Sequence, residues 1–198
     1  MQKNKNIKIK IMKKLIFVSI ILALFSCDFK EKQLKPNELE LNQKIISLGT
    51  DFKVNDGSLI KQKVPSIKTT FTLYKDKQKI AKASQKLLTI GAKIDVFDYE
   101  DVKIGSINEV LFTSFGLYSK YEILNQNNDI IAVSEKHQYF TTEFFISDLN
   151  GKPICKISRP AINIISDKWI IKFINQEFDK RLIIFIPFYK TFYDNNNN

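Results

Sequence analysis

Very few residues of this chain combine the type and the spacing that catalysis or metal binding requires. Its 198 residues include one histidine, His137, and two cysteines, Cys27 and Cys155. One histidine excludes a multi-histidine metal site, and two cysteines are too few for a disulfide framework or an all-cysteine zinc site. The six glycines form no phosphate-binding loop, dinucleotide fingerprint or nucleophile elbow. The sequence therefore predicts a protein that is not an enzyme and that needs no metal or cofactor.

The other candidates for chemistry have plainer interpretations. His137 lies in a polar stretch and is expected to face solvent on a strand or loop; a serine–histidine–aspartate site would depend on contacts between distant residues. Glu100 and Asp101 lie in a predicted turn, where carboxylates favour the turn and stay hydrated. Cys155 lies among strand residues and is interpreted as a small buried hydrophobe.

The N-terminus has the organisation of a secretory signal. Residues 1–26 hold six lysines and no acidic residue, and residues 15–25 form an apolar run. Eleven apolar residues are too few to cross a bilayer, which takes about 20, but they fit the hydrophobic region of a signal peptide. We therefore predict a signal peptide over residues 1–26.

The run ends in Leu24, Phe25, Ser26 and Cys27, which resemble the lipobox of bacterial lipoproteins. The resemblance implies cleavage before Cys27, a diacylglycerol thioether on its sulfur and an acyl chain such as palmitate on its amine. Two or three chains anchor a protein stably, whereas one does so only marginally. The predicted location is the bacterial cell envelope, on a periplasmic or extracellular membrane face. An ordinary signal peptide with a chance cysteine and an uncleaved anchor are the alternatives.

The rest of the chain divides into a tether, a domain and a tail. Residues 27–52 are rich in Lys, Glu, Gln and Asn and are predicted to be a solvated tether, with room for a short helix at 38–46. Residues 53–194 form the predicted domain, in which 52–67 supply one or two strands. Residues 195–198 are a predicted disordered tail.

The domain contains four copies of one pattern, and this pattern predicts hairpins. Each copy has two apolar residues at period two, a turn rich in Asp, Asn, Lys or Gly, and an aliphatic residue followed directly by a small one. The apolar pairs are Phe71 and Leu73, Ile94 and Val96, Tyr121 and Ile123, and Phe144 and Ile146; the small residues are Ala81, Gly105, Ala132 and Cys155. Because the small residue occupies the same position in every copy, a bulky group is expected to approach the sheet at that position.

The C-terminal part changes character. Residues 169–173 look like a last strand, and Asp179 can cap the apolar segment after it. Residues 182–193 are apolar nearly all round, which indicates burial because the segment is too short to span a membrane. An interior proline kinks or ends a helix, so we expect a buried helix that bends or breaks near Pro187.

From about residue 71 to residue 194 the chain resembles the LURP-one-related family of the tubby C-terminal-like superfamily, which includes phospholipid scramblases. The residues that carry the resemblance are the segment 85–91, the repeated strand–turn–strand units, and Asp179 ahead of the apolar terminal helix. The resemblance implies a mainly β fold, an antiparallel barrel of about 10–12 strands closed around a buried C-terminal helix. It also implies association with lipid or membrane.

Positive charge is concentrated beside the tether. Residues 53–93, here called the basic segment, hold ten lysines and two acidic residues, a net charge of +8. This predicts a surface that contacts anionic phospholipid headgroups, with Lys75, Lys77, Lys79 and Lys82 as candidate contacts, Lys82 the one least expected to share their face. A solvated strand face is the alternative. Predicted export and the near absence of arginine argue against nucleic-acid binding.

The sequence thus predicts a lipid-anchored, non-enzymatic envelope protein that acts at a membrane surface. The alternatives are a lipoprotein that binds a protein or glycan partner and, less favoured, an envelope hydrolase with an unrecognised site.

Overall fold

A computed structural model describes residues 37–44, 50–63, 69–86, 93–112, 118–138, 143–160 and 167–196. These residues all belong to one compact unit, Leu34–Asn198. The predicted signal peptide and Cys27 lie outside the described residues.

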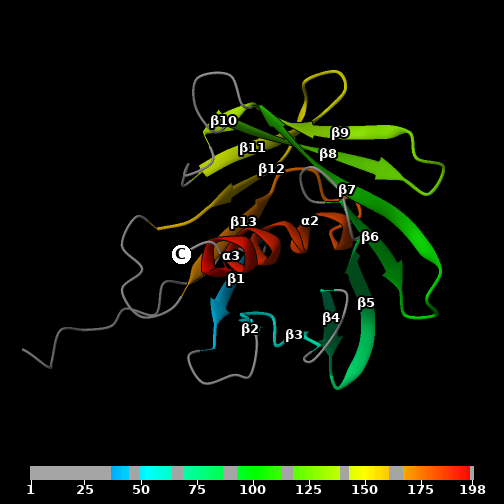
Figure 1. Cartoon of the computed structure of the whole chain (residues 1–198), viewed down its shortest axis with the longest axis vertical. Coiled ribbons are helices and arrows are strands. Elements are labelled where there is room, and N and C mark those ends of the chain that lie inside the picture. Colours follow the sequence, from blue (N-terminus) through cyan, green and yellow to red (C-terminus); the bar gives the residue numbers. More distant parts are fainter. Residues whose placement is uncertain are drawn as a thin grey trace, which may run out of the picture. The chain divides into compact units, whose positions relative to one another are not determined.

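The described strands form an antiparallel β-barrel (Figure 1). The strands are β1 Glu38–Gln43, β2 Phe52–Val54, β3 Leu59–Gln62, β4 Thr70–Lys75, β5 Gln78–Gln85, β6 Lys93–Asp98, β7 Lys103–Phe112, β8 Tyr118–Asn125, β9 Ile130–Ser134, β10 His137–Gln138, β11 Glu143–Asp148, β12 Pro153–Ser158 and β13 Lys168–Phe173. The order runs from β8 down to β1 and on through β13, β12, β11 and β9, and pairing of β9 with β8 closes a ring of twelve described strands. Short β10 pairs with β8 beyond β9. The predicted mainly β barrel is confirmed.

The two ends of the barrel differ. Because every neighbouring pair is antiparallel, the β2–β3, β4–β5, β6–β7, β8–β9 and β11–β12 connections all lie at one end, which we call the turn end. Strand β13 finishes at this end, and β1 starts there, since Glu38 pairs with Lys172. In Figure 1 the β6–β7 and β8–β9 turns lie on the right.

Three hairpins at the turn end use the same turn. Asp98, Asn125 and Asp148 each accept, at Oδ1, the main-chain N–H groups two and four residues ahead, at 2.8–2.9 Å. The residue at the fourth position has a positive φ in each turn: 65° at Asp101, 68° at Asn128 and 81° at Gly151. Asp, Asn and Gly tolerate this left-handed conformation better than other residues, which explains the repeated turn composition of the sequence.

The barrel begins earlier than predicted. Residues 38–43 form strand β1, so the expected short helix at 38–46 is wrong, and these residues belong to the barrel rather than to the predicted tether. Leu39 and Leu41 follow period two, and Leu41 is fully buried opposite Trp169. The prediction that 52–67 would supply one or two strands is confirmed by β2 and β3.

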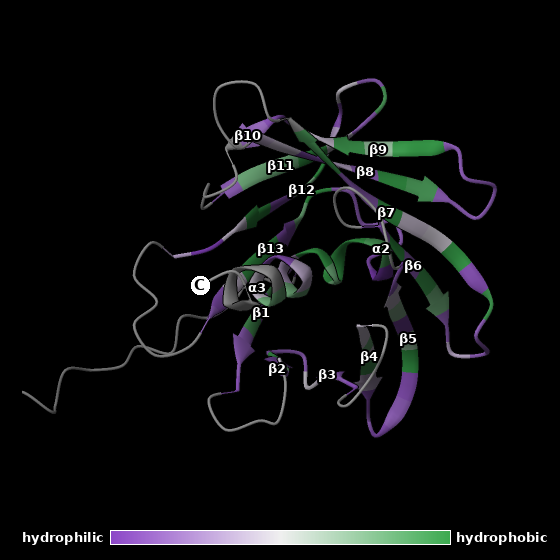
Figure 2. Cartoon of the chain, in the orientation of Figure 1, coloured by the Kyte–Doolittle hydropathy of each residue, from purple (hydrophilic) through white to green (hydrophobic). Residues whose placement is uncertain are grey.

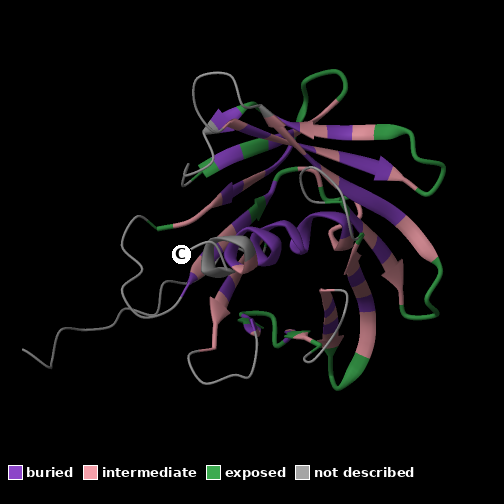
Figure 3. Ribbon diagram, viewed as in Figure 1, coloured by how far each residue is buried: buried purple, intermediate pink, exposed green. Residues whose placement is uncertain are grey.

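A broken helix fills the barrel. Helix α2, Arg181–Ile184, and helix α3, Ile186–Asn196, are interrupted at Phe185, and residues 182–191 are buried (Figure 3). Pro187 lies in the first turn of α3, where its missing N–H is not needed, so the break expected near Pro187 is confirmed. The Asp179 carboxylate accepts the N–H of Arg181 at 3.0 Å, but the N-cap of α2 is Lys180, which makes no side-chain capping bond, so Asp179 acts one residue before the cap. Helix α3 extends through Asn196, two residues into the predicted tail.

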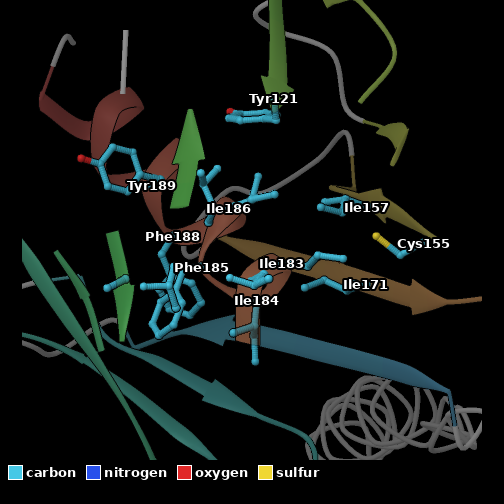
Figure 4. Packing of buried hydrophobic residues seen from close by; sticks show 14 of the residues in the cluster. Tyr121, Cys155, Ile157, Ile171, Ile183, Ile184, Phe185, Ile186, Phe188 and Tyr189 are labelled. Atoms are coloured by element: carbon cyan, nitrogen blue, oxygen red, sulfur yellow. The ribbon is translucent and has the colours of Figure 1, made fainter. Parts of the chain in front are cut away.

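The buried helix and the strands share one hydrophobic core (Figure 4). The four small residues of the repeat are all buried, and a Cβ built on Gly105 would lie 2.3 Å from the Leu124 carbonyl oxygen and 2.8 Å from Leu182 Cδ2. The bulky group that the sequence predicted next to Gly105 is therefore the helix, through Leu182, together with the main chain at Leu124. Within the described residues no helix has the length and apolarity needed to cross a membrane.

Candidate functional site

The four candidate lysines all belong to the β4–β5 hairpin of the barrel. Lys75 ends β4, Lys77 lies in the two-residue turn, and Lys79 and Lys82 lie on β5. The β4–β5 pairing passes from Leu73 opposite Ala81 to Tyr74 opposite Lys79. Residues three apart on a regular strand point to opposite faces, which is why Lys82 was expected to lie apart from Lys79. The bulge adds one residue to β5 between them, so this expectation does not apply.

Lys79 and Lys82 therefore act together on one acid. Their Nζ atoms lie 2.9 Å and 2.5 Å from the two carboxylate oxygens of Asp101. Hydrogen bonds from Lys82 and then Lys79 lower the pKa of Asp101, which keeps this carboxylate charged. Lys75 is also paired, at 3.5 Å from Asp56. Much of the positive charge here is thus neutralised locally, and in the described part of the chain Lys77 makes no ion pair.

A depression of about 470 Å³ lies beside Lys77. It is lined by Gly57, Leu59, Lys61, Tyr74, Asp76 and Lys77, from the β2–β3 turn, β3, β4 and the β4–β5 turn. Both lysines are exposed, and Lys61 Nζ lies 5.9 Å from the centre of the Tyr74 ring. We call this the lysine depression. Its lining contributes two lysines and one aspartate beside Leu59 and Tyr74. Two positive charges next to an apolar and aromatic surface suit a small anionic group attached to an apolar body. Figure 2 shows the hydrophilic β4–β5 turn.

The turn conformation presents Lys77 at the tip of its hairpin. Asp76 and Lys77 have φ angles of 50° and 66°. Two positive φ values are typical of the tight type I′ turn, in which the second position strongly prefers glycine. A lysine there costs about 1–2 kcal/mol in backbone strain, so Lys77 lies at a position where a side chain is disfavoured by local structure alone.

His137 is buried, and the prediction that it faces solvent is wrong. It retains 6% exposure, stacks on the Phe144 ring at 4.3 Å and on Tyr121 at 5.7 Å, and reaches Ser119 Oγ with Nε2 at 3.1 Å. Its Nδ1 lies 3.0 Å from the Glu135 carbonyl oxygen. Pairing of β10 with β8 brings these groups together. Burial lowers the pKa of His137, with a further contribution from Lys190, so the ring is neutral at pH 7.

The Ser119–His137 pair has the composition of a catalytic dyad but not the access. A neutral ring that donates from Nδ1 to the Glu135 carbonyl would accept the Ser119 proton at Nε2, as a general base does. Ser119 has no exposed surface, however, and the Glu135 carboxylate accepts the Phe145 N–H instead of orienting the ring. In this geometry the hydrogen bond between Ser119 and His137 gives each of two buried polar side chains a partner.

The other residues singled out from the sequence are structural. Cys155 is fully buried, and burial raises the pKa of its thiol to about 12, so it carries no thiolate at pH 7. Glu100 and Asp101 lie exposed in the β6–β7 turn, as predicted, and Asp101 also pairs with two lysines, which was not predicted. Three or more metal-binding side chains do not come together anywhere in the described residues.

One polar cluster was not predicted. Asp167, which is 5% exposed, accepts hydrogen bonds from Arg159, Trp169 and Thr191, and the Arg159 guanidinium lies 5.2 Å from the centre of the Trp169 ring. Asp167 also exchanges main-chain and side-chain hydrogen bonds with Gln43 of β1. These residues are widely separated in the sequence, so no local spacing indicates them. The cluster ties β13 to α3 and β1.

Comparison of the chain with protein families and with curated proteins finds no match to either.

Proposed function

We propose that this chain is a lipid-anchored, non-enzymatic protein of the bacterial cell envelope, whose barrel acts at the surface of the membrane that holds Cys27. The ligand that we propose is an anionic phospholipid headgroup bound in the lysine depression. The lipobox-like residues 24–27 and the resemblance to LURP-one-related proteins support this proposal.

The observation that carries the proposal is the position of the depression relative to the start of the domain. Asn55, in the β2–β3 turn, accepts the Glu40 N–H at 2.8 Å through its side chain and donates to the Glu38 carbonyl at 3.2 Å, so the start of β1 lies against this turn. Gly57 of the same turn lines the depression. The polypeptide that leads back to Cys27 therefore leaves the domain beside the two lysines.

The non-enzymatic part of the proposal rests on the state of the reactive side chains. The nucleophile of the Ser119–His137 pair is buried, and the Cys155 thiol has a raised pKa. Among the described residues, neither of these two groups is accessible to a substrate from solvent.

The anchor is tested first by replacing Cys27 with Ser in the full-length chain. Metabolic labelling with an alkyne fatty acid should mark the wild type and not C27S, and C27S should also lose lipoprotein-type cleavage. Equal labelling and equal mass in the two proteins would reject the lipid anchor.

The ligand is tested on acylated, full-length protein purified in mild detergent, by quantifying co-purified phospholipids. Lys61→Gln with Lys77→Gln should reduce the anionic phospholipid retained by about tenfold or more, since each lysine contributes about 1 kcal/mol near an anionic surface. Lys79→Gln with Lys82→Gln removes the same charge from residues already paired with Asp101 and should have a small effect. Equal losses in both variants would reject a defined site, and no anionic lipid in the wild type would favour a protein or glycan partner.

A further inference from the structure

The turn end exposes several large apolar side chains. In the described residues, six such side chains are exposed, and five lie at this end: Tyr99, Val102, Leu149 and Ile174 in connections, and Ile130 as the first residue of β9. The sixth, Phe145, lies on the outer wall in β11. Single exposed hydrophobic residues are common on proteins, and these five matter because they lie at the end where the polypeptide from Cys27 joins the barrel.

The turns hold these side chains in defined places. Tyr99 and Leu149 occupy the second position of two copies of the repeated turn, and they are the most exposed of the five, at 60% and 64%. Val102 occupies the fifth position of the β6–β7 turn, whose Asp98 accepts two main-chain N–H groups. The hydrogen-bonded turns prevent these tips from folding back onto the barrel, so their apolar surface stays available to something outside it.

The place where the polypeptide enters the barrel indicates that the turn end contacts the membrane. Asn37 accepts the Phe173 N–H at 2.9 Å, so the polypeptide joins the barrel at the end of β13, beside Ile174. Ten residues, 28–37, separate Cys27 from this point. Fully extended, they span at most about 35 Å. A bilayer that holds an acylated Cys27 therefore lies within about 35 Å of the turn end.

The turn end combines the lysine depression with separate apolar tips that suit the interfacial region of a bilayer. The β6–β7 and β8–β9 turns carry Glu100, Asp101 and Asp129 close to the apolar tips. These two turns contain no lysine, unlike the β4–β5 turn beside the lysine depression, so apolar insertion rather than attraction to negative charge drives contact at their tips. Apolar side chains on separate polar turns can each enter the headgroup–acyl boundary, whereas the buried centre of a protein interface is typically one apolar patch. Tyrosine is also enriched at membrane–water interfaces.

We infer that the turn end inserts Tyr99, Val102, Ile130, Leu149 and Ile174 into the headgroup region of the membrane that carries the acyl anchor, with the barrel standing on its turns. This inference rests on the proposed lipid anchor and adds the orientation of the domain and the residues that contact lipid. Contact by insertion is independent of the lysines and needs no anionic lipid.

The test places an environment-sensitive NBD label at single introduced cysteines in the acylated, full-length protein. Leu149→Cys and Tyr99→Cys report the turn end, and Phe145→Cys is the matched control, a large apolar residue that is also exposed but lies on the wall. Cys155 is buried with a raised pKa and does not compete for the label. Emission of Trp169, the only tryptophan and fully buried, verifies the fold of each variant.

Labelled proteins are reconstituted into phosphatidylcholine vesicles, with and without nitroxide-labelled lipid. Labels at 149 and 99 should shift to the blue and be quenched by the nitroxide lipid in low and high salt, while the label at 145 should be quenched only by aqueous iodide. The inference is overturned if labels at 99 and 149 behave like the label at 145, and the turn end would then be assigned to a protein partner. Co-sedimentation of the acylated protein with the vesicles reports the anchor separately, so loss of insertion and loss of anchoring are distinguishable.

Discussion

Trp169 and Thr191 form a hydrogen bond across the interior of the barrel: the indole Nε1 donates to the threonine Oγ1 at 2.9 Å. Trp169 belongs to β13 and Thr191 to α3, and both are fully buried. Thr191 in turn donates to Asp167 Oδ2, so the helix is fixed to the wall by directional contacts as well as by apolar packing. Such contacts specify one orientation of a helix whose apolar surface alone would fit in several.

Thr191→Val should destabilise the domain by about 1–3 kcal/mol, because it keeps the volume of the side chain but leaves Trp169 and Asp167 with fewer hydrogen-bond partners. Urea denaturation followed by Trp169 fluorescence measures this change. Thr72→Val on the outer face of β4 removes a hydroxyl from a partly exposed side chain and should change stability by less than about 0.5 kcal/mol. Equal effects of the two substitutions would contradict a role of the Asp167 cluster in holding α3.

Stability should fall as pH decreases through the range in which unfolded histidine is protonated. The pKa of His137 is lowered in the folded protein, first by burial, so below about pH 6.5 the unfolded chain binds a proton that the native state does not. The folded state loses up to about 1.4 kcal/mol per pH unit until its own, lower pKa is reached.

Because His137 is the only histidine, His137→Phe isolates this effect. Urea midpoints measured between about pH 7.5 and pH 5, a range that brackets the ordinary histidine pKa, should slope for the wild type and flatten for H137F, whatever the absolute stability of the variant. Parallel curves would mean that His137 is not the group responsible.

Gly105→Ala should destabilise the domain by about 2–3 kcal/mol or more, because the new methyl group would overlap the Leu124 carbonyl and Leu182 Cδ2. Gly57→Asn is the comparison, since nothing lies within 4 Å of a Cβ at Gly57. Its cost should be smaller, because it is limited to the backbone strain of a side chain at a φ of 86°, which asparagine bears better than most residues. A thermal unfolding midpoint that is unchanged in G105A would show that the helix does not pack against β7 as closely as these distances require.

The strand and turn positions could be predicted because they depend on local chemistry. Period-two pairs such as Phe144 and Ile146, and turns that start with Asp98 or Asp148, need only neighbouring residues to form. The apolar segment around Pro187 likewise predicts both burial and a break, because an all-round apolar helix must be covered and a proline lacks one N–H. Strand β1 was missed because its polar residues resemble a tether, and only pairing with β13 and β2 makes it a strand.

The candidate site depends on the tertiary structure to a greater extent. A bulge in the β4–β5 pairing, not the spacing of the lysines, brings Lys79 and Lys82 to the same carboxylate of Asp101, and this decides which lysines keep uncompensated charge. The burial of His137 follows from pairing of β10 with β8, and the Asp167 cluster joins residues separated by as many as 124 positions. The sequence by itself determined the hairpins, their turns and the buried helix, since these are encoded within a few residues. Closure of the barrel alone decided which end receives the polypeptide from Cys27, because the position of β1 between β2 and β13 is set by long-range hydrogen bonds.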